Sequence, residues 1–409
     1  MSEWKEYKLG DIAEILTGYP FKSNEYSATG TLKVVRGENV TIGDLRWDTV
    51  KCWEKSISTL GKYLLQKDDI VIGMDGSRVG KNRALVRENQ LPLILAQRVA
   101  RVRAKQNFDQ KFVWYLVFEK TFADYVDAIH TGTSIPHISL NQIADFEVVA
   151  PPYPLQIKIA NIFASLDDKI DLLTRQNKTL EQLAETYFRQ WFVEGTHKTK
   201  NGVLADFVSE TIGGEWGKDE PTEDFVVAVN CIRGTDIGDL ENGLAKKMPL
   251  RFVKQSKLDK IQPIDGDLIM EISGGTDDQS TGRAIYINEY LRRLFPNPLV
   301  FSNFSRLLRL KDKKYMYFVY SYIKHLYGQD EFYNYENGSS GIKNLDYKSI
   351  INGHIIQVPN DLSLITKYTQ FAQPLFDKIG RNKLQIQKLE GLRDNFLPKL
   401  MSGEIETKA

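Results

Sequence analysis

The chain has 409 residues, of which 42% are hydrophobic and 26% charged, a composition that excludes a disordered polypeptide and allows two or three domains. Its formal net charge of +1 excludes a uniformly basic protein, so any contact with nucleic acid has to use local positive charge. The two cysteines lie far apart, the start is polar, and no apolar stretch reaches the ~18 residues of a membrane span, so we expect a soluble cytoplasmic protein without disulfides or membrane contact.

The first predicted module covers residues 1–152. Short runs rich in β-branched residues predict strands at 32–35, 69–72 and 99–102, and clusters of glycine and aspartate between them supply turns. An aromatic stretch at 112–122 predicts a helix. Together these patterns predict a mixed α/β module with a largely antiparallel sheet.

A long helix is predicted over residues 153–196, after a proline-rich turn. Two interleaved series recur every seven residues, which is typical of the a/d seam of a coiled coil. The first series holds Ile159, Leu166, Leu173, Leu180 and Tyr187, and the second holds Phe163, Ile170, Asn177, Ala184 and Trp191. At about 1.5 Å per residue this seam spans roughly 48 Å.

A second module is predicted over 197–358, with strands at 225–229, 267–272 and 306–310 and a helix near 315–327. A second long helix is predicted over 359–405, with Pro374 starting or kinking it. Its seam has one series of Leu375, Asn382, Leu389 and Phe396, and another of Ile379, Ile386, Arg393 and Leu400.

The two long helices are expected to pack on each other as an antiparallel coiled coil, since each seam would otherwise stay in water. The alternative, that each helix packs only on its own module, remains open. Asn177 and Asn382 lie inside the seams, where a polar residue fixes the register at some cost in stability.

The chain contains the same plan twice, because six segments match in the same order. Residues 9–14 correspond to 204–208, 35–40 to 232–237, 69–72 to 267–270, 80–84 to 282–284, 132–134 to 338–340, and 180–183 to 389–392. Each match alone is weak, and the alternative is that turn residues coincide by chance. The order and the slow drift in spacing favour a tandem duplication.

Basic residues concentrate in the same part of each copy, at 78–105 and 283–314. Phosphate contacts need such local charge, although a solvated strand face explains most charge runs. The glycine-rich segment 76–81 is not a phosphate loop, because Asp75 stands where the first glycine belongs. The DNA-contact candidates are Arg78, Lys81, Arg83, Arg98 and Arg101 in the first copy, and Gln279, Arg283 and Arg306 in the second.

Two further loops and one pair of arginines are candidates for DNA contact. The loops offer Thr133, Ser134 and His137 in the first copy and Ser339, Ser340 and Lys343 in the second, which suit phosphate positioning. Arg36 and Arg233 occupy equivalent places before a glycine. They could read guanine through two hydrogen bonds or cap a turn, and the sequence leaves both roles open.

Catalytic and metal-binding patterns are missing from the sequence. Residues 150–153 read Ala-Pro-Pro-Tyr, whereas an amino-methyltransferase needs Asn or Asp in the first position to hold the target amine. No glycine-rich dinucleotide motif follows a strand, and the five histidines show no metal-ligand spacing. We therefore predict a protein without catalysis, metal or cofactor of its own.

The chain closely resembles the specificity subunit of Type I restriction–modification enzymes. The resemblance is carried by residues 4–15, 151–160, 166–171 with 188–192, and 397–405, and it extends over essentially the whole chain. It implies two mixed α/β target-recognition domains, 1–152 and 197–358, separated by a two-helix antiparallel coiled coil from 153–196 and 359–405. The unlike modules would read the two unlike halves of an asymmetric double-stranded DNA site.

In this family the coiled coil also docks two modification (methyltransferase) subunits, which are joined by restriction (translocase/nuclease) subunits. The resemblance thus implies a non-catalytic subunit, with S-adenosylmethionine bound by the modification subunit. The seam residues are the docking candidates: Ile159, Leu166, Leu173, Asn177, Leu180, Tyr187, Trp191, Leu375, Ile379, Asn382, Leu389 and Phe396. The remaining alternative is an assembly scaffold of another complex that does not read DNA.

Overall fold

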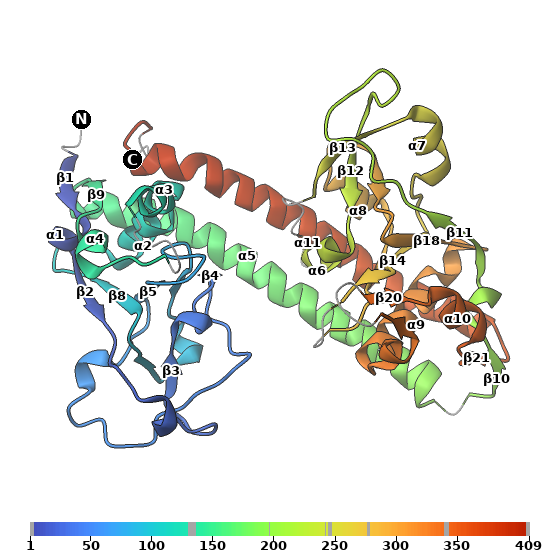
Figure 1. The fold of residues 1–409 in the computed structure, drawn as a ribbon, viewed down its shortest axis with the longest axis horizontal. Coiled ribbons are helices and arrows are strands. Elements are labelled where there is room, and N and C mark those ends of the chain that lie inside the picture. The colour runs from blue at the N-terminus through green and yellow to red at the C-terminus, as the bar shows by residue number, and fades with distance from the viewer. Residues whose placement is uncertain are drawn as a thin grey trace. The chain divides into compact units, whose positions relative to one another are not determined.

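The computed structural model describes residues 4–129, 136–195, 197–241, 243, 248–275, 279–338 and 343–405. The chain divides into two compact units: unit 1 is Met1–Asp168 with Gly391–Ala409, and unit 2 is Lys169–Glu390. Both boundaries fall inside long helices, α5 (Tyr153–Phe188) and α11 (Ser363–Met401), which are the long green and red helices of Figure 1. Each unit therefore contains part of both helices.

Unit 1 is built on a five-stranded sheet with β5 (Ile70–Gly73) at its centre. Its order is β2 (Ala13–Thr17), β8 (Val99–Ala104), β5, β6 (Arg83–Leu85) and β4 (Ile42–Gly43), and only the β4–β6 pair is parallel. Ile70 and Ile72 enter one hydrophobic cluster while Val71 enters another, as the two-residue period of a strand requires. The sheet is therefore covered on both faces.

The remaining elements of unit 1 cover this sheet. Two strand pairs are present, β1 (Lys5–Lys8) with β9 (Glu147–Ala150), antiparallel, and β3 (Lys33–Val35) with β7 (Leu93–Leu95), parallel. The helices are α1 (Leu9–Ile12), α2 (Gln110–Phe118), α3 (Lys120–Ile129) and α4 (Leu140–Ala144). The start of α5 and the end of α11 join the same core through Ile159, Phe163, Leu397 and Leu400.

Unit 2 repeats this plan around β14 (Leu268–Glu271). The antiparallel sheet has the order β11 (Val208–Gly213), β18 (Ser305–Leu310), β14 and β16 (Ala284–Tyr286). Leu268 and Met270 enter one cluster and Ile269 another, the same alternation as in β5. The helices are α6 (Ile237–Glu241), α7 (Gln255–Ile261), α8 (Glu289–Arg293), α9 (Met316–Gly328) and α10 (Tyr347–Gly353).

Smaller sheets complete unit 2. One has the order β13 (Leu250–Val253), β12 (Val227–Ile232) and β17 (Leu299–Phe301), with β12 and β17 parallel. Another has the order β15 (Ser273–Gly274), β20 (Lys343–Leu345) and β19 (Glu336–Asn337). An antiparallel pair joins β10 (Thr199–Gly202) and β21 (Ile356–Pro359), as β1 joins β9 in unit 1.

The strand registers confirm the duplication. In unit 1 Gly73 lies opposite Val99, and in unit 2 Glu271 lies opposite Ser305. One ion pair is also repeated: Arg103 Nε lies 2.7 Å from Asp69 Oδ1, and Arg309 Nη2 lies 3.0 Å from Asp267 Oδ2. Both arginines belong to the basic segments. Because their aspartate partners are buried, the two ion pairs stabilise the sheets.

The two long helices contact each other and run antiparallel, as predicted. In unit 2 Asn382 Nδ2 donates to Asn177 Oδ1 at 2.8 Å, and Tyr368 Oη donates to the Ala184 carbonyl at 3.3 Å. Going forward along α5, the contacted residue of α11 lies earlier in the sequence, so the two helices run in opposite directions. Helix α11 begins at Ser363 and continues through Pro374, so this proline does not start the helix, and the predicted kink stays a prediction.

Most side chains of the predicted a/d seam are buried or half-buried. Phe396 is the exception, because its side chain is 46% exposed while Leu397 beside it is buried. A straight helix drifts by about 20° per heptad against a seven-residue repeat, so the buried stripe moves by one residue near its end. Ile159, Leu173, Asn177, Ile379 and Asn382 are buried, whereas Leu166, Leu180, Tyr187, Trp191, Leu375 and Leu389 are half-buried. Trp191 follows α5 in a π-helical turn, Arg189–Val193.

Within the part of the chain that the structure describes, no helix combines the length and the apolar character needed to cross a membrane. The four-part division at residues 152, 196 and 358 stays a prediction.

Candidate nucleic-acid interface

The two units present different side chains at the same position, just before the strand that pairs with the central strand. In unit 1 the Met74 amide donates to the Arg98 carbonyl at 3.0 Å, and in unit 2 the Ile272 amide donates to the Phe304 carbonyl at 2.9 Å. With the registers above, these bonds make Arg98 and Phe304 equivalent. On the other side of the central strand, the Gly73 and Glu271 amides donate to the carbonyls of Asn82 and Arg283, which makes those two residues equivalent as well.

In unit 1 this position forms a small polar cluster. Arg98 has a φ of +66°, and its side chain is 67% exposed. Its Nη1 donates to Asp75 Oδ2 at 2.9 Å, which orients the guanidinium. Asp75 forms an antiparallel bridge with His137, an exposed residue, and Arg78 is exposed on the following turn. A non-glycine residue with positive φ is uncommon and occurs preferentially at functional sites.

In unit 2 the equivalent position borders a cavity of about 710 Å³. Phe304 is 56% exposed, and Gln279 is also exposed among the lining residues. Arg283 donates to Glu271 through Nε at 3.0 Å and through Nη2 at 2.8 Å. These two bonds raise the pKa of Arg283 above its ordinary value and hold its guanidinium in one plane.

Arg36 and Arg233 both precede a 3₁₀ turn and both support it. The Arg36 amide donates to Asn39 Oδ1 at 3.0 Å, and the Arg233 amide donates to Asp236 Oδ2 at 2.9 Å. The guanidinium of Arg36 forms an ion pair with Glu38, and that of Arg233 bonds to both oxygens of Asp236. Of the two roles left open by the sequence, these contacts favour turn capping.

Three other basic candidates lie at or near the surface with protein partners. Lys81 pairs with Asp127 at 2.8 Å, and Lys343 pairs with Glu336 at 3.2 Å. Arg306 lies over the ring of Tyr347, 5.5 Å from its centre. The four hydroxyl candidates, Thr133, Ser134, Ser339 and Ser340, lie outside the described residues.

Two arginines expected to contact DNA lie inside the fold. Arg83 is 6% exposed and donates to the carbonyls of Gly80, Phe118 and Glu119, and burial lowers its pKa to about 10. Arg101 is 3% exposed, donates to the Lys62 carbonyl and pairs with Glu14 at 2.7 Å. The expectation for both is corrected because neither side chain is available at the surface.

Sequence reasoning missed Asp75, Trp216, Glu271 and Phe304 as site residues, because it searched for basic and hydroxyl groups. One signal was available in the sequence: aligning residues 69–72 with 267–270 matches Gly73 with Glu271. A change from glycine to a charged residue at a matched position indicates that the two copies differ in function there.

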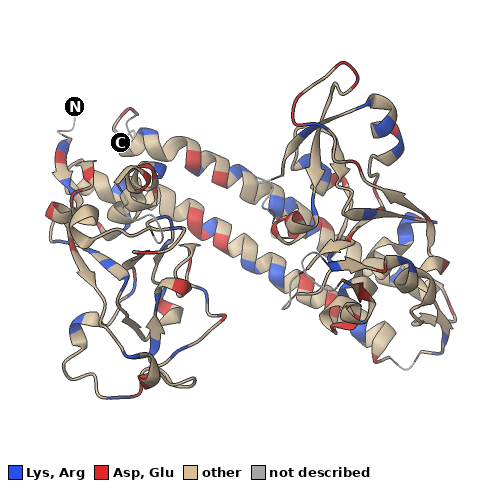
Figure 2. Cartoon of the chain, viewed as in Figure 1, with Lys and Arg blue, Asp and Glu red and all other residues tan. Residues whose placement is uncertain are grey.

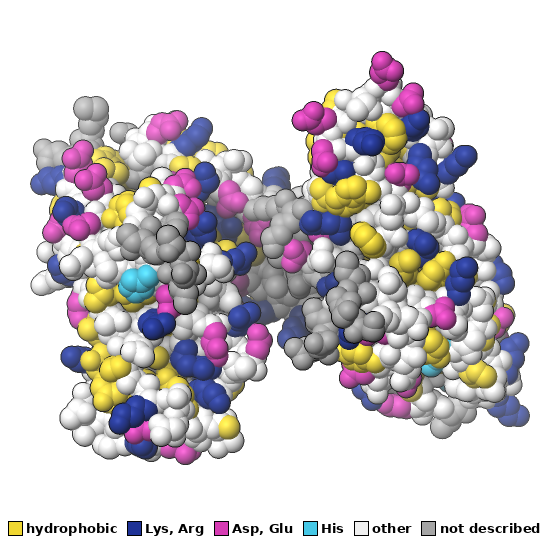
Figure 3. Space-filling view, viewed as in Figure 1, with side chains coloured by type: hydrophobic (Ala, Val, Ile, Leu, Met, Phe, Trp, Pro, Cys, Tyr) yellow, Lys and Arg dark blue, Asp and Glu magenta, His cyan; other side chains and the backbone are white. Residues whose placement is uncertain are grey.

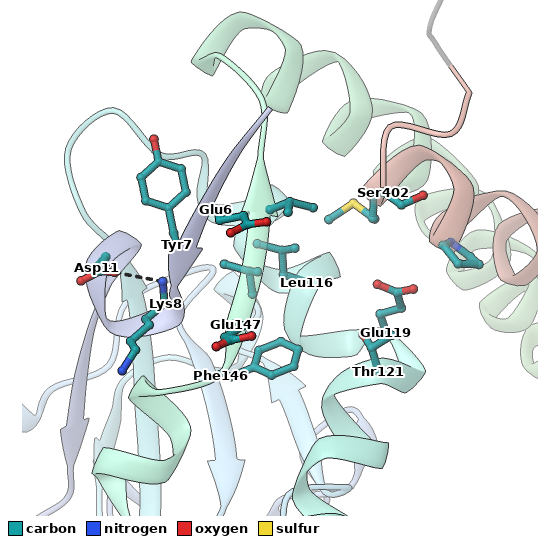
Figure 4. A pocket seen from close by; sticks show the side chains of 14 residues that line it. Glu6, Tyr7, Lys8, Asp11, Leu116, Glu119, Thr121, Phe146, Glu147 and Ser402 are labelled. Carbon is teal, nitrogen blue, oxygen red and sulfur yellow. Dashed lines mark hydrogen bonds between the residues drawn. The ribbon is translucent and has the colours of Figure 1, made fainter. Parts of the chain in front are cut away.

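A second cavity, of about 580 Å³, lies in unit 1 and does not suit a phosphate backbone. Glu6, Glu119 and Glu147 line it together with Ser402 near the end of α11 (Figure 4). Burial raises the pKa of Glu119. Lys8 also lines the cavity, but its Nζ is bonded to Asp145 at 2.8 Å. Carboxylates repel phosphates, so this cavity is not part of the interface.

Charge is mixed on both units. Acidic and basic residues alternate along α5 and α11 (Figure 2), and both kinds are interspersed over the surfaces in view of each unit (Figure 3). The faces in view carry no broad basic surface, so the candidate interface is defined by the equivalent positions. Among the described residues, no cluster of three or more His, Cys, Asp or Glu side chains is arranged to hold a metal ion.

The fold and the repeated position define a duplicated α/β protein whose units share a pair of antiparallel helices. The family model described as the Type I restriction modification DNA specificity domain matches residues 1–182. The Type I restriction enzyme MjaIX specificity subunit of Methanocaldococcus jannaschii is 24% identical over 433 residues, covering 99% of this chain and 89% of the relative. The EcoAI specificity subunit of Escherichia coli is 28% identical over 188 residues, covering 45% of this chain and 31% of the relative.

A solved structure has the same fold. The crystal structure of a Type I restriction-modification system S subunit from M. genitalium matches with a TM-score of 0.60 at 15% identity, covering 100% of this chain and 97% of that chain. The chain is therefore similar to Type I restriction–modification specificity subunits, through the family model over residues 1–182 and through a relative that covers nearly its whole length.

Proposed function

We propose that the chain reads a bipartite, asymmetric DNA site, with unit 1 reading one half and unit 2 the other. The observation that carries this proposal is the equivalent position before β8 and β18. It holds Arg98 beside Asp75 in unit 1, and Phe304 beside a cavity in unit 2. Two readers with one scaffold and unlike side chains should recognise unlike sequences.

Direct reading of bases fits the chemistry of Arg98. A guanidinium can donate two hydrogen bonds to O6 and N7 of guanine in the major groove, provided that its plane is fixed. Asp75 fixes it here, and the exposed side chain can reach beyond the surface. Arg78 and Lys81 lie on the neighbouring turn, where they can position the DNA backbone.

The coiled coil is proposed to dock two modification subunits through its outer face. Ile162, Leu172 and Leu183 on α5 are exposed, although they are large and apolar. Scattered exposed leucines are ordinary, but Leu172 and Leu183 are eleven residues apart and so lie on one face of the helix. Buried seam residues such as Leu173 would hold the helices together and would not touch the partner.

The rest of the complex follows from this assignment. The modification subunits would bind S-adenosylmethionine and perform the methyl transfer, and restriction subunits would join them. This chain would supply sequence recognition in the cytoplasm. A scaffold that does not read DNA stays the second candidate, because mixed surface charge alone does not require a nucleic-acid partner.

A gel-shift experiment separates the two candidates. The complex of this chain with its modification subunits is mixed with duplexes that contain or lack the motif found by methylome sequencing of the source cells. Specific binding, weakened by salt in proportion to the phosphates contacted, is expected. Binding with neither sequence preference nor salt dependence would favour the scaffold.

A further inference from the structure

The cavity of unit 2 has the lining of a site for a flat, polar ring. Its volume of about 710 Å³ falls in the range of roughly 300–1,000 Å³ that is usual for small-ligand sites. Apart from its glycines, every described residue that lines the cavity is aromatic or carries a hydrogen-bonding side chain. Such a lining suits a heterocycle better than it suits a lipid or an apolar peptide.

Phe304 supplies a stacking surface at the edge of the cavity. It lies on the turn between β17 and β18, and its ring is 56% exposed although the residues on either side of this turn are in the core. Trp216 also lines the cavity, with the guanidinium of Arg251 4.4 Å from its ring centre. Exposed aromatic rings next to a cavity stabilise unstacked bases by accepting their flat faces.

The hydrogen-bonding groups of the cavity are fixed before a ligand arrives. Glu271 is 1% exposed and holds Arg283 through two bonds, which use two of the five N–H donors of the guanidinium. Ser302 is buried and lines the cavity, and its Oγ has no hydrogen-bond partner among the described residues. A buried hydroxyl without a partner is uncommon, and a ligand with a polar edge would satisfy it.

Two glycines keep this space open. A Cβ at Gly234 would collide with the carboxylate of Glu271, and a Cβ at Gly274 would lie 2.7 Å from Glu271 Oε1. Gly274 also has a φ of +152°, which other residues rarely adopt. Side chains at either position would push Glu271 away from Arg283.

We propose that this cavity receives a nucleobase of the recognised duplex that has turned out of its stack, with its ring against Phe304 and its acceptor edge facing Arg283. The proposal rests on the function proposed above. It applies to unit 2 alone, because the equivalent residues of unit 1 are Arg98, Gly73 and Asn82. The two units would thus read DNA in two ways, one by an arginine fork and the other by capture of a base.

The test uses the complex of the full chain with its modification subunits, bound to the duplex of the methylome motif. Each position of the half-site read by unit 2 is replaced in turn by a fluorescent analogue: 2-aminopurine, 6-methylisoxanthopterin or pyrrolocytosine, whose emission rises on unstacking. Thymines are probed by permanganate. One position besides the methylated base is expected to become unstacked, and Phe304→Ala should abolish that signal.

The control variants separate stacking from folding. Phe304→Tyr keeps the ring and should keep the signal, while Ile264→Ala, at an exposed apolar position of the same unit, should change nothing. Phe304→Ala should weaken specific binding roughly 5- to 150-fold, the usual effect of losing one base–aromatic stack. It should also make the methylome motif degenerate at the same position.

Three outcomes would overturn the proposal. Sequence-specific binding without an unstacked base beyond the methylated one would refute base capture while leaving the proposed function intact. A signal that persists in Phe304→Ala would place the base elsewhere. Tight binding of free nucleoside monophosphates, lost in Phe304→Ala but without an unstacked base in the duplex, would make the cavity a free-nucleotide site. If the wild-type complex showed no sequence preference, that result would instead contradict the proposed function.

Discussion

Arg98 is the single residue at which the unit 1 site can be tested most directly. Replacing it by alanine should remove discrimination at one base pair in one half of the motif, worth about 1–3 kcal/mol, because the two hydrogen bonds to the base edge are lost. Competition binding with duplexes altered at each position measures this. Arg78→Ala is the matched control and should weaken all sequences alike, lowering the salt slope by about 1. Unchanged discrimination at every position in Arg98→Ala would contradict the assignment.

Lys383 gives a pH-dependent prediction at the same scale. Its side chain is 6% exposed on α11, and burial lowers its pKa to about 8, although Glu181 and Glu241 oppose the shift and Lys324 adds to it. In the unfolded chain the lysine pKa is about 10.4. Between these values the unfolded state binds more protons, so this group makes stability rise with pH, by at most about 1.4 kcal/mol per unit.

Lys383→Met should remove this rise. The variant should be more stable than the wild type at pH 7, where the buried lysine is mostly charged, and the difference should shrink as the pH increases from 8 to 10. Urea unfolding at several pH values measures both effects. Lys388→Met, at an exposed position of the same helix, should show no such trend. A difference that does not depend on pH would mean that Lys383 titrates normally in the fold.

The roles of individual residues were harder to predict from the sequence than the secondary-structure elements. The basic segments were visible in the sequence, but strand alternation and sheet pairing decide which members face outward. Arg98 is exposed, Arg101 is buried, and Arg103 pairs with Asp69, so three arginines of one short segment have three environments. The exposed ring of Phe304 likewise depends on a turn geometry that composition does not encode.

The long helices were more predictable from the sequence, because their apolar periodicity depends only on residues close together in the chain. The seven-residue series placed Asn177 and Asn382 in the seams, and the structure pairs their side chains. The series failed at Phe396, where the drift between 3.6 and 3.5 residues per turn has accumulated. The matching central strands were also visible, since runs buried on both faces remain apolar throughout.

The asparagine pair leads to a prediction about the helix pair. Replacing Asn177 or Asn382 alone by leucine should destabilise unit 2 by about 1–3 kcal/mol, because the remaining amide is left buried with fewer partners. The double variant should recover most of this loss, since two leucines of similar size leave no unpaired amide. Urea unfolding of the four proteins forms a double-mutant cycle.

Gln182→Leu, at an exposed position of α5, is the control for this cycle and should stay within about 0.5 kcal/mol of the wild type. A double variant as unstable as the sum of the single variants would show that the asparagines act independently. Recovery of stability together with altered helix pairing would support the role of the pair in fixing register.

At the scale of the whole molecule, the proposed function requires that sequence recognition be joined to methylation through the shared helices. Leu172 and Leu183 are 51% and 39% exposed on α5, whereas Leu173 between them is 3% exposed in the seam. Changing Leu172 and Leu183 together to aspartate should leave the fold intact and abolish co-purification of the modification subunits, because two charges would be buried at the docking face. Leu250→Asp, equally exposed on β13, should co-purify normally. Methylome sequencing adds a sharper readout: the docking variant should lose methylation at both halves of the motif, whereas Arg98→Ala or Phe304→Ala should alter only one half. Normal co-purification of the docking variant would move the docking face off this side of α5, and loss of methylation at a single half would mean that each modification subunit docks on separate residues.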